Sequence, residues 1–245
     1  MNYKDFTDSY IETKYGKIHY KHNDSNGIEL VLLHGLGASS IVWRKLVESL
    51  TTNFHIFAMD LLGHENSDKP RIKYNVEVQV EVLKEFIEKA CKKPFVMGHS
   101  YGGWITAYYA YLKLPASGII LEDAAGLKEY FDAISRSINY EDYKKALLRK
   151  LLMENNNDEY VISSIIENEG YNLLTQDMLA RIDVPTLIIW GSNDDVIDKK
   201  FSYLFNENIK NSRLIIIEDS GHNPHYTKPY DVAVAINNFV TSSHD

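Results

Sequence analysis

The sequence of 245 residues is poor in two features, cysteine and positive charge. Its single cysteine, Cys91, cannot form a disulfide bond within the chain, which fits a reducing compartment, and we expect a cytoplasmic protein. Lysine and arginine number 26 against 34 acidic residues, giving a formal net charge of −8 at pH 7. Contacts to phosphate need clustered basic side chains, so this balance argues against nucleic acid as a partner.

Long apolar runs are also missing. No run approaches the ~20 apolar residues that span a bilayer, so we expect no membrane span. The first ten residues, MNYKDFTDSY, are polar and lack the apolar core of a secretory signal. The sequence contains 44% hydrophobic and 24% charged residues, as ordinary globular domains do, and shows no repeats or low-complexity linker. These features predict one soluble domain.

What is present is an alternation of short β-branched segments with longer segments of helical spacing. This pattern is typical of a mostly parallel central sheet with helices on both faces, an α/β fold. After a hairpin at 10–13 and 17–21, strands are predicted at 28–33, 54–59, 95–97, 118–121, 186–190 and 214–217. Helices are predicted at 40–50, with Ser40 as the cap, and at 76–90, 101–112, 199–205 and 229–240. Residues 126–180 show helical spacing only, which predicts a helical insertion into one α/β domain.

A serine between glycines directly follows one predicted strand, in the segment PFVMGHSYGG at 94–103. A nucleophile exposed at a sharp turn from strand to helix needs neighbours without Cβ atoms, as Gly98 and Gly102 provide around Ser100. The following helix would direct its N-terminus at developing negative charge. Because this short pattern also arises by chance, a catalytic Ser100 requires a base and an acid elsewhere in the chain.

Two later loops carry those groups in the order that the strand–serine–helix turn predicts, serine, then acid, then histidine. The strand at 186–190 leads into an acidic loop with Asp194, and the strand at 214–217 leads into a loop with His222. Sites in parallel sheets form at the carboxyl ends of strands, so these residues should meet Ser100 at one rim. His222 would then take the proton of Ser100 and return it to the leaving group, while Asp194 orients the imidazole.

Five motifs in this order make the chain resemble the α/β-hydrolase superfamily over nearly its whole length. They are HGLG at 34–37, DLLGHENS at 60–67, GHSYGG at 98–103, WGSNDDVI at 190–197 and GHNPHYTKP at 221–229. The resemblance implies a Ser–Asp–His hydrolase whose core is formed by residues 1–125 and 181–245, with residues 126–180 as a helical cap, or lid. It also implies an oxyanion hole made by the backbone N–H groups of Leu36 and Tyr101.

The acid of the triad has alternatives. The family spacing favours Asp194 over Asp195, which would be a loop or helix-cap residue. Asp123 follows another predicted strand, and some members of the superfamily carry the acid there, so Asp123 is the alternative acid. The chain departs from the family pattern at Glu65, where glycine is usual, and at Asp198, where proline is common.

Nothing in the sequence calls for a cofactor or a metal. His225 lies three residues after His222, but no carboxylate or cysteine set accompanies the pair in sequence, so we expect a surface histidine and no metal site. His99 should be structural. The segment GLGASS at 35–40 is similar to a dinucleotide-binding loop, but Ser40 stands where glycine or alanine is needed.

The expected partner is a small-molecule ester. The reaction predicted is hydrolysis of carboxylic esters with small or medium acyl groups through an acyl-Ser100 enzyme, the activity of a carboxylesterase. The same triad also serves carbon–carbon hydrolases of ring-cleavage products, thioesterases, acyltransferases and prolyl aminopeptidases, although the last typically carry HGGPG where this chain has HGLGA. A non-catalytic ligand receptor is the alternative from another class. Tyrosines and leucines of 126–180 should wall an apolar pocket and set specificity, whereas Trp104 is predicted to be a core residue.

Overall fold

A computed structural model describes residues 2–51, 53–137, 139–155 and 157–242. Its centre is an eight-stranded sheet with the strand order β1-β2-β4-β3-β5-β6-β7-β8. The strands are β1 Thr7–Thr13, β2 Gly16–His22, β3 Ile28–Leu33, β4 Phe54–Met59, β5 Phe95–His99, β6 Gly118–Glu122, β7 Thr186–Gly191 and β8 Ser212–Ile217. The β1–β2 and β2–β4 pairs are antiparallel, and the other five pairs are parallel. The predicted α/β fold class is confirmed.

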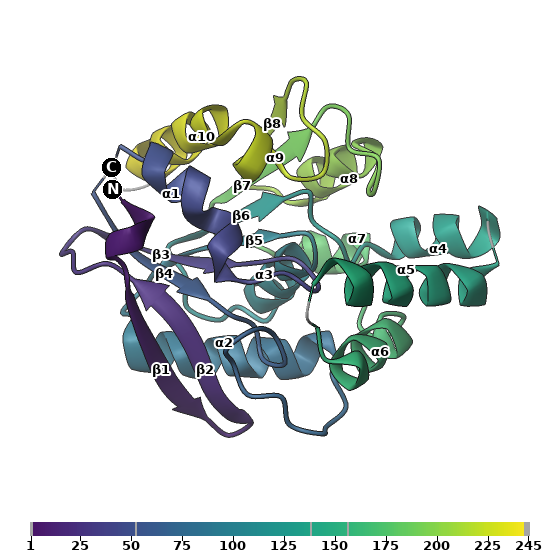
Figure 1. Ribbon diagram of the computed structural model, residues 1–245. Helices are drawn as coiled ribbons and strands as arrows, with labels where there is room; N and C mark the ends of the chain where they lie inside the picture. The colour runs from purple at the N-terminus through teal and green to yellow at the C-terminus, as the bar shows by residue number, and fades with distance from the viewer. Residues whose placement is uncertain (1, 52, 138, 156, 243–245) are drawn as a thin grey trace.

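Helices cover both faces of the sheet (Figure 1). They are η1 Tyr3–Asp5, η2 Ser40–Trp43, α1 Arg44–Ser49, α2 Val76–Ala90, α3 Tyr101–Tyr111, α4 Lys128–Ser137, α5 Tyr140–Glu154, α6 Glu159–Asn168, α7 Gln176–Leu179, α8 Lys200–Asn208, α9 Pro224–Thr227 and α10 Pro229–Ser242, where η marks a 3-10 helix. In Figure 1, α1 and α10 lie together on one side of the sheet, and α2 lies on the other.

The apolar run of β3 explains why that strand is central. Successive side chains of a strand point to opposite faces, so Leu30 and Leu32 enter one buried cluster and Val31 and Leu33 the other. All four side chains are fully buried. A strand that alternated between apolar and polar residues would leave one of these two cores unfilled.

All of the chain between β6 and β7 that forms regular structure is helical in the described residues, apart from one isolated bridge between Leu127 and Leu174. Figure 1 shows α4 and α5 extending past the sheet near the ends of β5 and β6. Side chains cap α6 and α7, since Asp158 accepts from the N–H of Val161 and Thr175 accepts from that of Met178. The helical character predicted for this segment is therefore confirmed. That residues 126–180 form a cap separate from the core stays a prediction.

The predicted helix at 40–50 differs from the structure. Residues 40–43 form a 3-10 turn before α1, and the N–H of Ser40 donates to Asp60 Oδ1 at 2.7 Å, so Ser40 is not a helix cap. Asp60 also accepts from His19 Nδ1 at 2.7 Å. Burial opposes ionisation of Asp60, but the hydrogen bonds from His19 and from the backbone N–H of Ser40 hold its pKa below the usual range. Asp60 thus ties the 3-10 turn to the hairpin.

Candidate active site

Ser100 lies in a strained turn between β5 and α3. Its backbone φ is 51°, in the left-handed region that side chains seldom adopt. A Cβ atom at Gly98 would lie 2.0 Å from the carbonyl oxygen of Gly102, and one at Gly102 would lie 2.3 Å from that of Leu33. Neither position therefore accepts a side chain. The chain can turn this sharply because the residues two positions before and after Ser100 are glycines, and Ser100 is the residue at which α3 begins.

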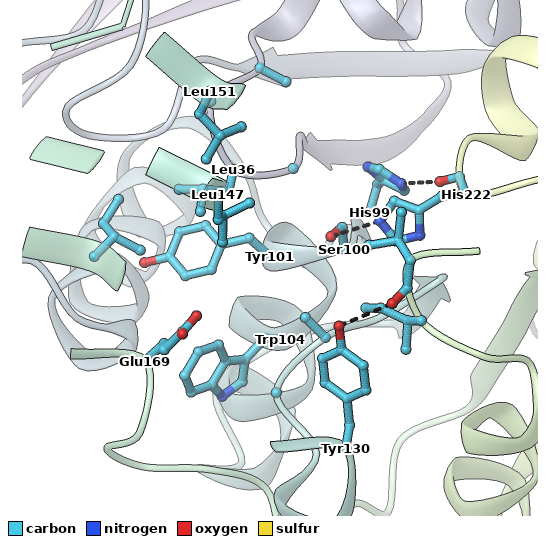
Figure 2. Close-up of a pocket in the computed structure, with 18 of the residues that line it drawn as sticks. Leu36, His99, Ser100, Tyr101, Trp104, Tyr130, Leu147, Leu151, Glu169 and His222 are labelled. Atoms are coloured by element: carbon cyan, nitrogen blue, oxygen red, sulfur yellow. Dashed lines mark hydrogen bonds between the residues drawn. The ribbon is translucent and has the colours of Figure 1, made fainter. Parts of the chain in front are cut away.

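The structure brings Ser100, His222 and Asp194 together. His222 Nε2 lies 3.1 Å from Ser100 Oγ, and His222 Nδ1 lies 2.8 Å from Asp194 Oδ2 (Figure 2). The other oxygen of Asp194 accepts from the N–H groups of Val196 and Ile197 at 2.8 and 2.9 Å. With both oxygens of Asp194 occupied, Nδ1 is the donor to the carboxylate, which leaves Nε2 as the acceptor for the serine hydroxyl.

Two backbone N–H groups lie beside Ser100 without acceptors among the described residues. They belong to Leu36 and Tyr101, and both residues line the same cavity as Ser100. His34 supports the first of them, because its Nδ1 is 2.7 Å from the carbonyl oxygen of Gly35 and its Nε2 accepts a backbone N–H from the loop after β4. Burial lowers the pKa of His34, so a neutral imidazole makes both contacts. Both N–H groups are thus available at the cavity beside Ser100, and their role as an oxyanion hole stays a prediction.

Asp123 lies behind the acid of this trio. Its carboxyl group is fully buried, its Oδ1 accepts the N–H of Gly191 at 2.9 Å, and an oxygen lies within 4.8 Å of a ring nitrogen of His222. Burial, followed by the charges of Glu122 and Asp194, raises the pKa of Asp123 well above its usual value. Burial therefore favours the neutral form of Asp123. Asp195, the other candidate, is exposed.

His225 is buried, which makes the expectation of a surface histidine wrong. Its Nδ1 and its backbone N–H donate to the two oxygens of Glu122, at 2.6 and 2.8 Å, and both side chains are almost fully buried. His99 packs against it and donates from Nε2 to the carbonyl oxygen of His222 at 2.6 Å. Burial holds the pKa of His99 well below its usual value, in keeping with that neutral, structural position. These contacts fix the backbone on which His222 stands.

Glu122 is a residue of the site that the sequence prediction does not include. The predicted strand ends at residue 121, which places Glu122 in the loop that follows, whereas β6 ends at Glu122. The sequence signal was present, since an acid directly after four apolar strand residues needs a buried partner. Atoms of His99, Glu122 and His225 that could bind a metal lie within 4.8 Å of one another. Both oxygens of Glu122 already accept hydrogen bonds from His225, so a hydrogen-bonded pair accounts for the cluster.

Replacing His225 with alanine is expected to lower the free energy of unfolding by about 3 kcal/mol, because Glu122 would lose a buried charge-assisted hydrogen bond and a cavity would form. Urea unfolding followed by circular dichroism measures the loss. Glu122→Gln and the double variant complete a cycle, in which the pair should be strongly non-additive. A loss below about 1 kcal/mol in His225→Ala would contradict this account of the pair.

A cavity of about 330 Å³ opens beside Ser100. Its walls are mostly apolar, and many come from the segment between β6 and β7 (Figure 2). The described lining residues from this segment include Tyr130, Tyr143, Leu147, Leu151, Ile165 and Glu169. Trp104, predicted as a core residue, is buried but also lines the cavity. A pocket of this size suits a small molecule rather than a polymer.

Among the described residues, none of the helices combines the length and the apolar character needed to cross a bilayer. A sequence model described as the alpha/beta hydrolase family matches residues 30–236, which is most of the chain. That range contains all three residues of the trio and both proposed oxyanion donors.

Curated proteins with different substrates match the chain at similar identity. Human monoacylglycerol lipase ABHD6 is 26% identical over 257 aligned residues, which cover 88% of this chain and 76% of the relative. A 2-hydroxy-6-oxo-6-(2'-aminophenyl)hexa-2,4-dienoic acid hydrolase from Metapseudomonas resinovorans is also 26% identical, over 96% of this chain and 89% of the relative.

Solved structures share the fold at lower identity. A bacterial membrane phospholipase A has a TM-score of 0.80 and 24% identity, covering 98% of this chain and 87% of its own. A serine hydrolase involved in carbazole degradation has a TM-score of 0.80 and 23% identity, covering 96% and 99%. The solved structures support the fold, while the family match supports a hydrolase. The names of the curated relatives point to different substrates.

Proposed function

The chain belongs to the alpha/beta hydrolase family, and we propose that it is a serine esterase that cleaves carboxylic esters with small or medium acyl groups. The observation that carries the proposal is the contact of 3.1 Å between Ser100 Oγ and His222 Nε2, with Asp194 on the other ring nitrogen. A serine in this arrangement is a nucleophile with its base in place.

In the acylation half, His222 Nε2 takes the proton of Ser100 as the serine oxygen attacks the ester carbonyl. The negative charge that develops on the carbonyl oxygen is held by the N–H groups of Leu36 and Tyr101 and by the N-terminus of α3. Asp194 stabilises the imidazolium that forms. His222 then protonates the departing alcohol, which leaves the acyl group on Ser100.

Deacylation reverses the roles. His222 takes a proton from a water molecule, and the resulting hydroxide attacks the acyl-Ser100 carbonyl. The same two N–H groups hold the second oxyanion, and His222 returns the proton to Ser100 Oγ as the carboxylic acid leaves. The contact of His99 with the His222 carbonyl supports the base during both halves, because it fixes the loop on which the imidazole stands.

Two measurements on the same protein test the proposal. A fluorophosphonate should label Ser100 covalently, as found by peptide mass spectrometry, and p-nitrophenyl butyrate should be turned over at a steady rate. Labelling without turnover would point to a ligand receptor on this scaffold. An absence of both would refute the esterase.

We further propose that residues 126–180 act as a cap that limits the length of the acyl group. Leu147 lies on the cavity wall, so Leu147→Trp should fill part of the cavity. We expect kcat/KM for p-nitrophenyl octanoate to fall about tenfold or more relative to p-nitrophenyl acetate, because the larger side chain occupies the space of the long chain. Leu148→Trp on the same helix, outside the lining residues, is the control. Equal acetate-to-octanoate ratios in both variants would contradict the cap assignment.

A carbon–carbon hydrolase is the second candidate, and the dienoic acid hydrolase from Metapseudomonas resinovorans, which aligns over 96% of this chain, favours it. Such an enzyme would cleave 2-hydroxy-6-oxohexa-2,4-dienoic acids, and loss of the dienoate absorbance reports that cleavage. A kcat/KM for such an acid above that for the p-nitrophenyl esters would assign the chain to carbon–carbon cleavage.

A further inference from the structure

One carboxyl group faces the otherwise mostly apolar cavity. Among the lining residues that the structure describes, Glu169 is the only acid. Figure 2 shows it on the far side of the pocket from Ser100 and His222, with Trp104 and Tyr130 between the two ends. An acid has no use in a site for purely hydrocarbon chains, because burying it costs free energy without a partner.

The hydrogen-bonding capacity of Glu169 is only partly used. Its Oε1 accepts from the hydroxyl group of Tyr140, while its Oε2 has no hydrogen-bond partner among the described side chains and backbone groups. It stands at the C-terminal end of α6, where the helix dipole disfavours a negative charge. Burial raises the pKa of Glu169, and the Tyr140 hydrogen bond and the charge of Lys144 offset that effect only in part. The ionised carboxyl group thus lacks a full counter-charge.

The groups around Glu169 are aromatic hydroxyls rather than cations. Tyr140 on α5 donates to Glu169, and Tyr143 on the same helix lies near it, whereas the hydroxyl group of Tyr130 on α4 donates to the backbone oxygen of Val196. Lys144 on α5 is shared with Glu141, at 2.5 Å. The buried hydroxyl group of Tyr101, on the same side in Figure 2, has no partner among the described residues. At this end of the cavity, the buried Tyr101 hydroxyl lacks a partner and Glu169 Oε2 is available to a ligand, whereas buried polar groups in proteins are normally satisfied.

We propose that Glu169 forms a subsite for a hydrogen-bond-donating end group of the substrate, a hydroxyl or a protonated amine, held across the cavity from the bond that Ser100 attacks. The inference rests on the proposed serine esterase and names its substrate class: esters with a polar donor at the end of a short apolar chain. The apolar walls contact the chain, and Oε2 accepts from its end. Trp104 and the tyrosines suit either donor, since aromatic faces also attract ammonium groups.

Matched esters test the subsite. The first series contains p-nitrophenyl esters whose acyl chain has four to eight carbons and ends in methyl, hydroxyl, ammonium or carboxylate. The second series contains acetate esters of the corresponding alcohols. The end group is thus placed on either the acyl side or the alcohol side of the ester. At the best chain length, a hydroxyl or ammonium end should raise kcat/KM about tenfold or more over methyl, and carboxylate should lower it. Equal rates for methyl and both donor ends would overturn the subsite while leaving the esterase intact. No turnover of any ester would instead overturn the esterase.

Three variants attribute the preference. Glu169→Met should bring the ratio of donor to methyl esters close to one, because the acceptor is removed. Glu169→Gln keeps an acceptor but no charge, so it should retain part of the hydroxyl preference and lose the ammonium preference. Glu167→Met is the matched control, because Glu167 lies two residues away on α6, is exposed and does not line the cavity. A ratio that changes equally in Glu167→Met and Glu169→Met would overturn the assignment.

The pH dependence separates the two donors. Ionisation of Glu169 strengthens its attraction for a cation, so the ammonium preference should grow as the pH rises through the elevated pKa of this carboxyl group. The hydroxyl preference should change little, because either form of the carboxyl group can accept from a hydroxyl. The methyl ester, measured at each pH, corrects each profile for the pH dependence of the hydrolytic reaction itself. An ammonium preference that is constant with pH, or that survives in Glu169→Gln, would contradict the role of the carboxylate.

Discussion

Ser100→Ala is expected to lower kcat for p-nitrophenyl butyrate by roughly 10⁴- to 10⁶-fold, the loss typical when a hydrolase loses its nucleophile. The hydroxyl group is the only part removed, while the oxyanion donors are backbone groups and stay in place. The residual rate should therefore still exceed that of the ester in buffer. Steady-state kinetics with freshly purified protein measures the change.

Controls are needed because trace contamination by another esterase would mask so large a loss. Ser135→Ala, on the exposed face of α4, makes the same chemical change away from the cavity and should keep full activity. The far-ultraviolet circular dichroism of Ser100→Ala should match that of the wild type. A loss of less than tenfold would place the nucleophile elsewhere.

Asp194→Asn is expected to lower kcat by about 10³- to 10⁴-fold. The asparagine amide would present an N–H group to His222 Nδ1 or force the imidazole into the other tautomer, so that Nε2 could no longer accept the proton of Ser100. The N–H groups of Val196 and Ile197 can still bind a side-chain oxygen, so the loop should keep its conformation. The loss should thus appear in kcat more than in thermal stability.

Asp123→Asn should change kcat by less than about tenfold, because burial already holds the proton on Asp123 and the amide resembles this neutral form. The two variants form a direct contrast between neighbouring acids of the site. A large loss in Asp123→Asn together with a small loss in Asp194→Asn would reverse the assignment and make Asp123 the orienting acid.

Local patterns in the sequence were sufficient where one element determines its own structure. The helix predicted at 76–90 is α2 with the same bounds, because its apolar spacing lies within the segment and its cap, Asn75, directly precedes it. The turn around Ser100 was also accessible, since Gly98 and Gly102 are needed by atoms only a few residues away or on the adjoining strand.

Features that depend on distant partners were not accessible. His225 and Glu122 are 103 positions apart, so the acid at the end of an apolar strand indicates a buried partner but not which residue that partner is. Serine is a common helix cap, which is the basis of the prediction for Ser40, but the backbone N–H of Ser40 instead donates to Asp60 from another loop. Nothing in the sequence distinguishes Glu169, since an acid at the end of a helix is common and only the folded chain brings it to the cavity.

Ser100 and His222 are 122 positions apart, and the sheet brings them together only when β8 has paired with β7. Chains with such non-local contacts fold slowly, because distant segments must meet before either is stabilised. A partly folded molecule that has completed β3 to β6 would carry a nucleophile without a base. The recovery of esterase activity during refolding therefore reports the last step of assembly. Activity should appear with the slowest structural phase rather than with the first collapse of the chain.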